Sequence, residues 1–299
     1  MHNLLRASRG TVEKGDTRHM TGTYSDVTPI TPVLGGMVTG LDLSAPLSLE
    51  QFEVLEQALH DHQVLFFREQ PMTLEQHKSL GGRFGELHVH PAAPKGAEHP
   101  EVLVVHADAE STFVPGGLWH SDVSCDEIPP MASILRIEQL PATGGDTMFS
   151  SMYAAYEALS DRMQRLLGEL TAVHEGRQYY VGRYGDGHLR DESYPSAEHP
   201  ALRTHPRTGR TALYVNEGFT VGFKELKRAE SDALLAFLIK HCASPEFTCR
   251  FRWEANSVAF WDNRCTQHFA IWDYYPQTRH GYRVAVKGDR PFYAPPTAG

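Results

Sequence analysis

The sequence predicts a mainly β protein of the α+β class, with a jelly-roll core that carries flanking helices. Short runs of β-branched and other apolar residues fill the middle and C-terminal parts of the chain, and turns with glycine and proline separate them. Amphipathic helical stretches interrupt these runs. Many short strands joined by long loops are typical of a jelly roll, and 299 residues suit a single β domain.

The N-terminal part begins without a structural pattern. Residues 1–24 mix charged, small and polar side chains with no apolar periodicity, so we expect a flexible segment there. One domain should follow over residues 25–299. Its first strand is expected within residues 33–43, where apolar residues alternate around glycines before Pro46.

Two capping-box patterns predict the first helices. Ser48 is followed three residues later by Gln51, and Thr73 by Gln76. In such a pair each side chain accepts a hydrogen bond from the backbone N–H of the other residue, which satisfies two donors at a helix start. Residues 64–67, between the two helices, predict a short buried strand.

Five more strands and two more helices are expected further along the chain. The strands are predicted at residues 102–105, 133–137, 212–215, 257–261 and 283–286. The helices are predicted at residues 163–170, with Leu166 and Leu167 facing inward, and at residues 231–242.

Composition narrows the class of partner. The chain has 28 basic and 37 acidic residues, a formal charge of −9, which argues against nucleic acid or an anionic membrane as the main partner. No apolar run approaches the length of a membrane span and no signal-peptide pattern follows Met1, so we expect a cytoplasmic protein. The four cysteines show no Cys-x-x-Cys pairing and are expected to be reduced thiols.

The clearest candidates for chemistry are His120, Asp122 and His268. On a strand, His120 and Asp122 would point to the same side, and the opposed sheets of a jelly roll can bring the distant His268 to them. Two imidazoles and one carboxylate on one face of a divalent ion leave the other positions open, as in non-heme Fe(II) oxygenases. Zinc in a hydrolase is an alternative for the same three residues.

Two arginines follow His268. Arg279 and Arg283 lie four positions apart, so on a strand both would face the same side. An oxygenase of this type needs a fixed cation for the far carboxylate of its cosubstrate, and arginine binds carboxylates through two parallel hydrogen bonds. The alternative interpretation is a pair of exposed charges on an edge strand.

Over residues 30–293 the sequence resembles the taurine and phenoxyacetate dioxygenases of the TauD/TfdA family, and its motifs are closest to the taurine dioxygenase branch. These are Fe(II)- and 2-oxoglutarate-dependent enzymes on a double-stranded β-helix. The stretches that carry the likeness are residues 83–88, 119–124, 144–147, 214–220 and 261–268, continuing to Arg279, Arg283 and residues 288–289. Several ordered motifs at compatible spacing are far more specific than an isolated His-x-Asp.

The resemblance implies a reaction and the residues that serve it. His120, Asp122 and His268 match the iron ligands. Thr147 matches a threonine whose hydroxyl binds a carboxylate of 2-oxoglutarate, and Arg279 matches the arginine that pairs with a carboxylate of the same cosubstrate. With O2, such a site would hydroxylate an sp3 carbon and release succinate and CO2, with the metal and cosubstrate providing the difficult chemistry.

The resemblance also implies a substrate pocket. Arg283 matches an arginine that meets the anionic group of the substrate, and His90 matches a pocket histidine of the same branch. Phe219 and, more loosely, Tyr180 fall where the pocket has aromatic walls. Both aromatic residues would be equally ordinary in a hydrophobic core.

Two departures from the taurine enzymes bear on the substrate. Ala93 stands where those enzymes have a tyrosine, and Pro-Gly-Gly at residues 115–117 replaces an expected asparagine. Both changes remove bulk and polar contacts, and a site without hydrogen bonds to a substrate discriminates poorly in its favour. We therefore expect a small organic anion other than taurine: a sulfonate, a sulfate ester, or an aryloxy or alkyl carboxylate.

Two other functions would use the same His/Asp/His set. One is a metal-dependent hydrolase, and the other is a non-catalytic jelly roll that binds a ligand. The hydrolase gives little reason for Thr147 together with Arg279, and the intact triad argues against the non-catalytic protein. The family leans toward dimers and tetramers, so a homo-dimer or homo-tetramer is expected, with no nucleic-acid or membrane partner.

Overall fold

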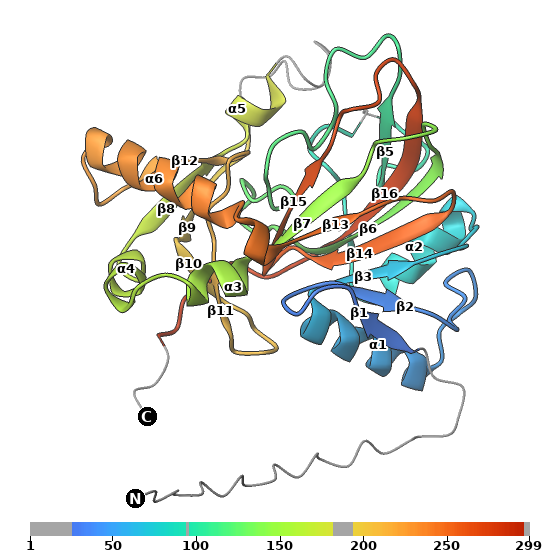
Figure 1. Ribbon diagram of the computed structural model, residues 1–299, viewed down its shortest axis with the longest axis horizontal. Helices are drawn as coiled ribbons and strands as arrows, with labels where there is room; N and C mark the ends of the chain where they lie inside the picture. Colours follow the sequence, from blue (N-terminus) through green and yellow to red (C-terminus); the bar gives the residue numbers. More distant parts are fainter. Residues whose placement is uncertain (1–25, 94–95, 182–193, 296–299) are drawn as a thin grey trace, which may run out of the picture.

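Two β-sheets that pack face to face form the centre of the fold (Figure 1). The computed structural model describes residues 26–93, 96–181 and 194–295, so the segment predicted to be flexible at residues 1–24 lies outside the described residues. Phe66, Phe149 and Trp261 are among the buried side chains between the two sheets.

The large sheet has eight strands. In chain order they are β1 (Val27–Pro29), β2 (Gly36–Val38), β3 (Val64–Phe67), β4 (Leu87–His88), β5 (Val102–Ala107), β6 (Pro130–Gln139), β14 (Ser257–Asp262) and β16 (Arg279–Lys287). Their order in the sheet is β1-β2-β3-β14-β6-β16-β4, and β5 also pairs with β16. Only β2 and β3 pair in parallel; the other described pairs of this sheet are antiparallel.

The smaller sheets complete the strand inventory. The second sheet of the central sandwich is β13-β7-β15, made of β13 (Thr248–Phe251), β7 (Thr147–Ser151) and β15 (Thr266–Ala270). Apart from it lie the sheet β12-β8-β9 and the hairpin β10-β11, made of β8 (Thr171–Glu175), β9 (Ser196–Pro200), β10 (Leu202–Thr204), β11 (Thr211–Leu213) and β12 (Thr220–Phe223). The predicted mainly β class is confirmed, although the sheets do not close into a barrel.

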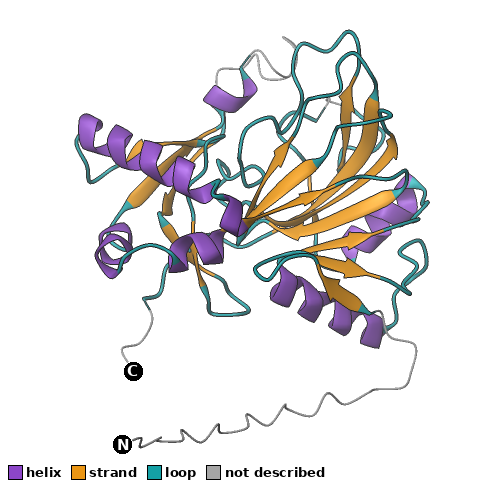
Figure 2. Ribbon diagram, viewed as in Figure 1, coloured by secondary structure: helices purple, strands orange, loops and turns teal. Residues whose placement is uncertain are grey.

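The helices lie outside the central sandwich (Figure 2). They are α1 (Leu49–His62), α2 (Leu74–Gly82), α3 (Met152–Glu157), α4 (Asp161–Leu167), α5 (Arg177–Tyr180), α6 (Arg228–Cys242) and the 3-10 helix η1 (Pro245–Phe247). Helices α1 and α2 pack on the outer face of the large sheet through a cluster that includes Leu55, Leu80 and Phe260. Helices α3 and α6 bury a separate cluster with the β10-β11 hairpin, including Tyr153, Leu213 and Leu238.

Both predicted capping boxes are confirmed. The Ser48 hydroxyl accepts from the Gln51 N–H at 3.1 Å, and the Gln51 side chain accepts from the Ser48 N–H at 2.9 Å. Thr73 and Gln76 repeat this arrangement at 3.2 and 2.8 Å. Each box satisfies two backbone donors that the helix itself cannot satisfy, which explains why α1 and α2 begin where they do.

One predicted strand and one predicted helix differ clearly from the structure. The strand expected within residues 33–43 is limited to β2, because Gly35 and Gly40 adopt positive φ angles on either side of it. Helix α4 ends at Leu167 with Gly168 as its C-cap, three residues before the predicted end. Leu167 is buried as expected, whereas Leu166 is 40 % exposed, so the prediction that it faces inward was wrong.

Two chain-wide expectations can be compared with the described residues. The helices within the described ranges are all too short or too polar to span a bilayer. The four cysteines are buried and form no disulfide.

Candidate active site

His120, Asp122 and His268 converge in a cavity between the two central sheets. Asp122 Oδ1 lies 3.6 Å from His120 Nε2 and 3.8 Å from His268 Nε2. One potential ligand atom from each residue lies within 4.8 Å of the other two, and the three side chains are almost completely buried. Donors that bind one ion at about 2 Å each have separations of this order. The three residues therefore fit a single divalent metal.

The local backbone differs from the predicted strand. His120 forms an isolated β-bridge with His268, in which the His120 N–H donates to the His268 carbonyl at 3.1 Å and the reverse bond measures 2.9 Å. The chain then turns at Asp122, and Val123 adopts a φ of 47°. The prediction that alternation along a strand aligns His120 with Asp122 was wrong. The bridge sets the two histidines side by side, and the turn returns the carboxylate to them.

Both histidines are arranged to present a nitrogen lone pair. His120 Nδ1 lies 2.8 Å from the Leu118 carbonyl, which can only accept, so the proton sits on Nδ1 and Nε2 is left as a donor atom for a metal. Burial, followed by the neighbouring His120, lowers the pKa of His268 well below its ordinary value. Neutral imidazole is the form that binds metals.

Asp122 is an ionised carboxylate in a buried place. Burial raises its pKa, but the Arg283 guanidinium and the two histidines outweigh this effect, and the pKa lies well below its ordinary value. Oδ1 accepts a hydrogen bond from Arg283 Nη1, and Oδ2 accepts one from the Ser133 hydroxyl at 2.6 Å. Arg283, matched from the sequence to a substrate ligand, thus contacts the carboxylate of the triad while it also lines the cavity.

Arg279 supplies a second buried cation in the cavity. It is 2 % exposed, and no carboxylate in the described part of the chain forms an ion pair with it. Its Nε donates to the Gly145 carbonyl at 3.0 Å, and the nearby Asp146 pairs with Arg250 instead. Burial lowers the pKa of Arg279 to about 10, so the guanidinium stays charged at neutral pH. A buried cation at an open cavity calls for an anionic ligand.

Thr147 lies beside this cation. Its hydroxyl oxygen accepts from Trp253 Nε1 at 3.0 Å and lies 3.4 Å from Arg279 Nη2. Because both of these partners are donors only, the Thr147 proton is available to an oxygen of a ligand. Arg279 and Thr147 together therefore form a donor set that fits one carboxylate.

The rest of the cavity wall is largely apolar. Besides the triad, Thr147 and the two arginines, the described residues that line the cavity are His90, Leu103, Val105, Pro115, Gly116, Val123, Leu135, Tyr179, Phe219, Trp261 and Ala270. Phe219 is on the wall, as the resemblance implied. Tyr180 does not line the cavity; it is buried behind it, with its ring centroid 5.8 Å from that of His90. The wall position belongs to its neighbour Tyr179.

Tyr179 is one of the cavity residues that the sequence did not reveal. Its ring centroid lies 5.4 Å from that of His120 and 4.7 Å from that of Phe219. Its hydroxyl accepts a hydrogen bond from the Gly116 N–H at 3.0 Å. The two adjacent tyrosines were the available sign of this part of the aromatic wall in the sequence. Which of them faces the cavity depends on the short helix α5, and four residues are too few to show a helical periodicity.

His90 stands at the cavity in a defined protonation state. Burial, followed by the Arg283 charge, lowers its pKa to about 3. Its Nδ1 accepts from the Ala92 N–H at 3.1 Å, so the proton of the neutral ring is on Nε2. This placement suits a hydrogen-bond donor to an anionic substrate.

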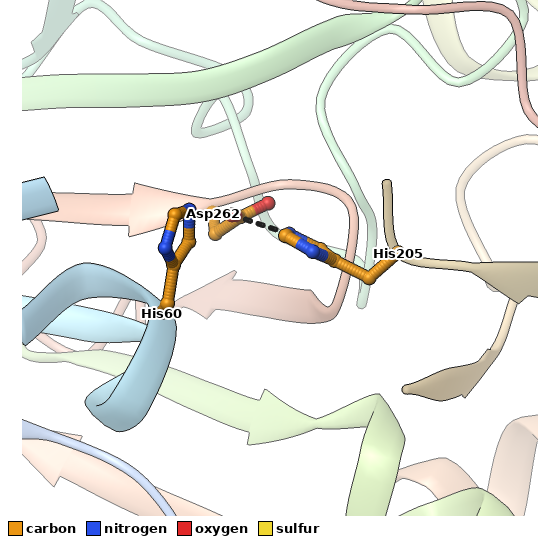
Figure 3. Close-up of side chains that lie close together, drawn as sticks. All are labelled: His60, His205 and Asp262. Carbon is orange, nitrogen blue, oxygen red and sulfur yellow. Dashed lines mark hydrogen bonds and ion pairs between the residues drawn. The ribbon is translucent and has the colours of Figure 1, made fainter. Parts of the chain in front are cut away.

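A second group of metal-binding residue types has a different character. His60, His205 and Asp262 also lie within 4.8 Å of one another (Figure 3). Arg264, however, donates to both oxygens of Asp262 at 2.6 to 3.2 Å, and His205 Nε2 lies 3.0 Å from Oδ2. His205 Nδ1 accepts from two backbone N–H groups, which places its proton on Nε2, toward Asp262. The carboxylate is already neutralised, so this group is a structural ion pair.

Comparisons with known proteins agree with the geometry. A family model described as taurine catabolism dioxygenase TauD, TfdA family matches residues 26–285. An alpha-ketoglutarate-dependent sulfate ester dioxygenase of Pseudomonas putida is 35% identical over 281 residues, which are 89% of this chain and 90% of that protein. An alpha-ketoglutarate-dependent sulfonate dioxygenase of Saccharomyces cerevisiae is 32% identical over 278 residues, 89% of this chain and 67% of that protein.

A solved structure gives the same result for the fold. The crystal structure of a taurine dioxygenase from Burkholderia xenovorans superimposes with a TM-score of 0.77 at 37% sequence identity, covering 89% of this chain and 92% of that chain. Alpha-ketoglutarate is another name for 2-oxoglutarate, so the predicted cosubstrate appears in the names of both curated relatives. The chain belongs to the TauD/TfdA family of Fe(II)- and 2-oxoglutarate-dependent dioxygenases, as its motifs predicted.

Proposed function

We propose that this dioxygenase hydroxylates an sp3 carbon of a small organic anion, with His120, Asp122 and His268 as the iron ligands. The observation that carries the assignment of the site is the position of Arg279. Its buried guanidinium has no carboxylate partner among the described residues and lies in the same cavity as two neutral imidazoles and an ionised carboxylate. A hydrolase with the same triad would have little reason for a second, fixed anion site, and a protein that only binds a ligand would not need an intact metal triad.

Each side chain has a task that follows from its environment. When bound, iron and 2-oxoglutarate would supply the oxygen activation that couples decarboxylation of the cosubstrate to hydroxylation, with succinate and CO2 as products. Arg279 and Thr147 would hold a carboxylate of 2-oxoglutarate through charge-assisted and hydroxyl hydrogen bonds. The apolar walls, including Phe219, would exclude water and hold the reacting carbon.

Arg283 and His90 would bind the anionic group of the substrate. Both line the cavity next to the triad, and the neutral His90 carries its proton on Nε2. Arg283 contacts Asp122 in this structure, and metal binding to Asp122 Oδ1 would free part of the guanidinium for the substrate. A sulfonate, a sulfate ester or an aryloxy or alkyl carboxylate fits this pocket. With a heteroatom on the hydroxylated carbon, the product would break down to a carbonyl compound and a released fragment.

The substrate class can be tested directly. The protein is incubated in air with Fe(II), 2-oxoglutarate and a panel of alkyl sulfates, alkyl sulfonates, aryloxyacetates and taurine, and succinate is measured. We expect at least one organic anion to accelerate succinate formation, and taurine to do so weakly. Absence of any stimulation, together with tightly held zinc in protein purified without added metal, would instead support the hydrolase.

The metal ligands can be tested by one substitution with a matched control. His268→Ala should abolish Mn(II) binding, measured by calorimetry without oxygen, because it removes one of three ligand atoms. His174→Ala removes an equally buried histidine outside the triad and should leave Mn(II) affinity within about twofold of the wild type. Equal Mn(II) affinities for both variants would show that His268 is not a metal ligand.

Three further expectations are part of this proposal. We propose that residues 25–299 form one domain, that the protein is cytoplasmic and that it assembles as a homo-dimer or homo-tetramer. Light scattering on the eluting peak of a sizing column measures the assembly, and a monomeric mass at micromolar concentration would contradict it.

A further inference from the structure

The two oxygens of Asp122 have different surroundings. Oδ1 faces the histidine nitrogens at 3.6 and 3.8 Å. Oδ2 points away from them and accepts a hydrogen bond of 2.6 Å from the hydroxyl of Ser133, on strand β6. Ser133 itself is fully buried. One oxygen is thus directed at the metal site and the other into the protein.

A chain of hydrogen bonds with a fixed direction supports Ser133. Trp261 Nε1 can only donate, and it lies 2.9 Å from Asn263 Oδ1, so the amide of Asn263 has one allowed orientation. Asn263 Nδ2 then donates to Ser133 Oγ at 3.0 Å. Since that oxygen accepts from Asn263, the Ser133 proton is directed to Asp122 Oδ2.

Asn263 also holds the backbone around Asp122. Its side-chain oxygen accepts from the Asp122 N–H at 3.3 Å, and its carbonyl accepts from the Ser121 hydroxyl at 2.7 Å. The turn after β14 and the turn that carries Asp122 are thereby joined. Asn263 is 1 % exposed, so these hydrogen bonds form in a region of low dielectric constant. Hydrogen bonds are stronger there than in water, and they fix the position of Asp122 more firmly.

From these contacts we propose that Ser133 and Asn263 are positioning residues that present a single oxygen of Asp122 to the metal. This inference rests on the proposed ligand set. If Oδ2 were without its hydrogen bond, the carboxylate could rotate and bind the ion through both oxygens, or move toward Arg283. By holding Oδ2, the serine would limit Asp122 to one coordinating oxygen, which would leave room on a bound metal for other ligands.

The test is Ser133→Ala, which removes the hydroxyl and little volume. Mn(II) affinity is measured without oxygen, by calorimetry, and the Tm of the metal-free protein is measured in parallel. We expect the Mn(II) dissociation constant to rise about 10- to 100-fold, as for other residues that orient a metal ligand. The matched control is Ser150→Ala, because Ser150 is equally buried and donates a hydrogen bond of the same 2.6 Å length, but to the Cys242 carbonyl. Its Mn(II) affinity should remain that of the wild type.

A double variant tests whether Asn263 acts on Asp122 through Ser133. If Asn263 acts partly through Ser133, the loss of Mn(II) affinity in Ser133→Ala/Asn263→Ala should be smaller than the product of the two single losses. Unchanged affinity in Ser133→Ala, or an equal loss in Ser150→Ala, would overturn the inference. A wild-type protein that binds no Mn(II) would contradict the proposed ligand set instead, so the two failures are distinguishable.

Discussion

Two buried arginines, Arg279 and Arg283, divide the electrostatic tasks of the site. Both belong to strand β16 and both face the cavity. Arg283 is already neutralised by Asp122, whereas Arg279 is bonded to a carbonyl and a hydroxyl and remains a net positive charge. A buried charge without a counter-ion is costly, so binding an anion at Arg279 gains more than the same contact would gain on the surface.

Arg279→Ala should therefore act mainly on the cosubstrate. We expect the 2-oxoglutarate dissociation constant of the Mn(II)-loaded protein to rise about 10- to 100-fold, because a hydrogen bond to a charged group contributes roughly 1.5–3 kcal/mol. Arg279→Lys keeps the charge but loses the planar fork, and should give an intermediate value. Calorimetric titration with 2-oxoglutarate measures all three proteins. If the alanine variant bound 2-oxoglutarate normally, the anion site would have to be assigned elsewhere.

For single residues, the sequence predicted which side chains face the cavity better than it predicted their hydrogen-bond partners. The predicted common orientation of Arg279 and Arg283 is confirmed, because it follows from the two-residue period of a strand. The Arg283 contact with Asp122 was not predictable, since it joins a strand to a turn whose path depends on the β-bridge between His120 and His268. For the same reason the contacts of Asn263 with Ser133 and Asp122 were not predictable.

Among the elements, the short helix α5 and the loop around Gly116 meet over the cavity. The Tyr179 hydroxyl accepts from the Gly116 N–H, and Gly116 has a φ of 90° that favours glycine. A Cβ on Gly116 would also lie 3.3 Å from Ala270 and 3.4 Å from the ring of His120. The Pro-Gly-Gly segment thus follows a path close to a proposed iron ligand, and Tyr179 holds it there.

Tyr179→Phe should loosen this contact and leave the triad in place. Loss of the hydroxyl leaves the Gly116 N–H without its protein acceptor, a change that costs about 1–3 kcal/mol when the donor stays buried. We expect amide hydrogen exchange of residues 113–119 to accelerate while Mn(II) affinity stays within about twofold of the wild type. Tyr180→Phe keeps the Tyr179 bond to Gly116 and should exchange as the wild type does. Unchanged exchange in Tyr179→Phe would show that the loop is held by other contacts.

Elements with local signals were predictable, and those set by long-range pairing were not. Helices α1 and α2 were found from their capping boxes, which need only four residues each. Strands β7 and β15, which carry Thr147 and His268, were not predicted because Thr147–Ser151 and Thr266–Ala270 contain polar side chains on both faces. Their pairing with each other, rather than their own sequence, makes them strands.

Across the whole molecule, several histidines are buried in neutral form away from the triad. His77 on α2 is fully buried under the large sheet, and its Nε2 lies 3.1 Å from the Ile134 carbonyl. Burial, followed by the charge of Arg136, lowers its pKa from 6.5 to about 4, against the effect of the bond to Ile134. His174 and His199 also have lowered pKa values, of about 3 and about 4, chiefly through burial. The fold therefore requires these rings to remain uncharged.

This requirement predicts a loss of stability as the pH falls. Below pH 6.5 the unfolded chain binds a proton at His77 that the folded protein rejects until about pH 4, so stability decreases through that window by up to about 1.4 kcal/mol per pH unit for this group. His77→Gln keeps a donor for the Ile134 carbonyl but cannot titrate. Urea unfolding of the metal-free proteins at pH 7.5 and pH 5 should show a smaller loss of stability in His77→Gln than in the wild type. Equal losses in both proteins would mean that the unfolded chain also keeps His77 neutral, or that the buried ring reaches solvent when it is protonated.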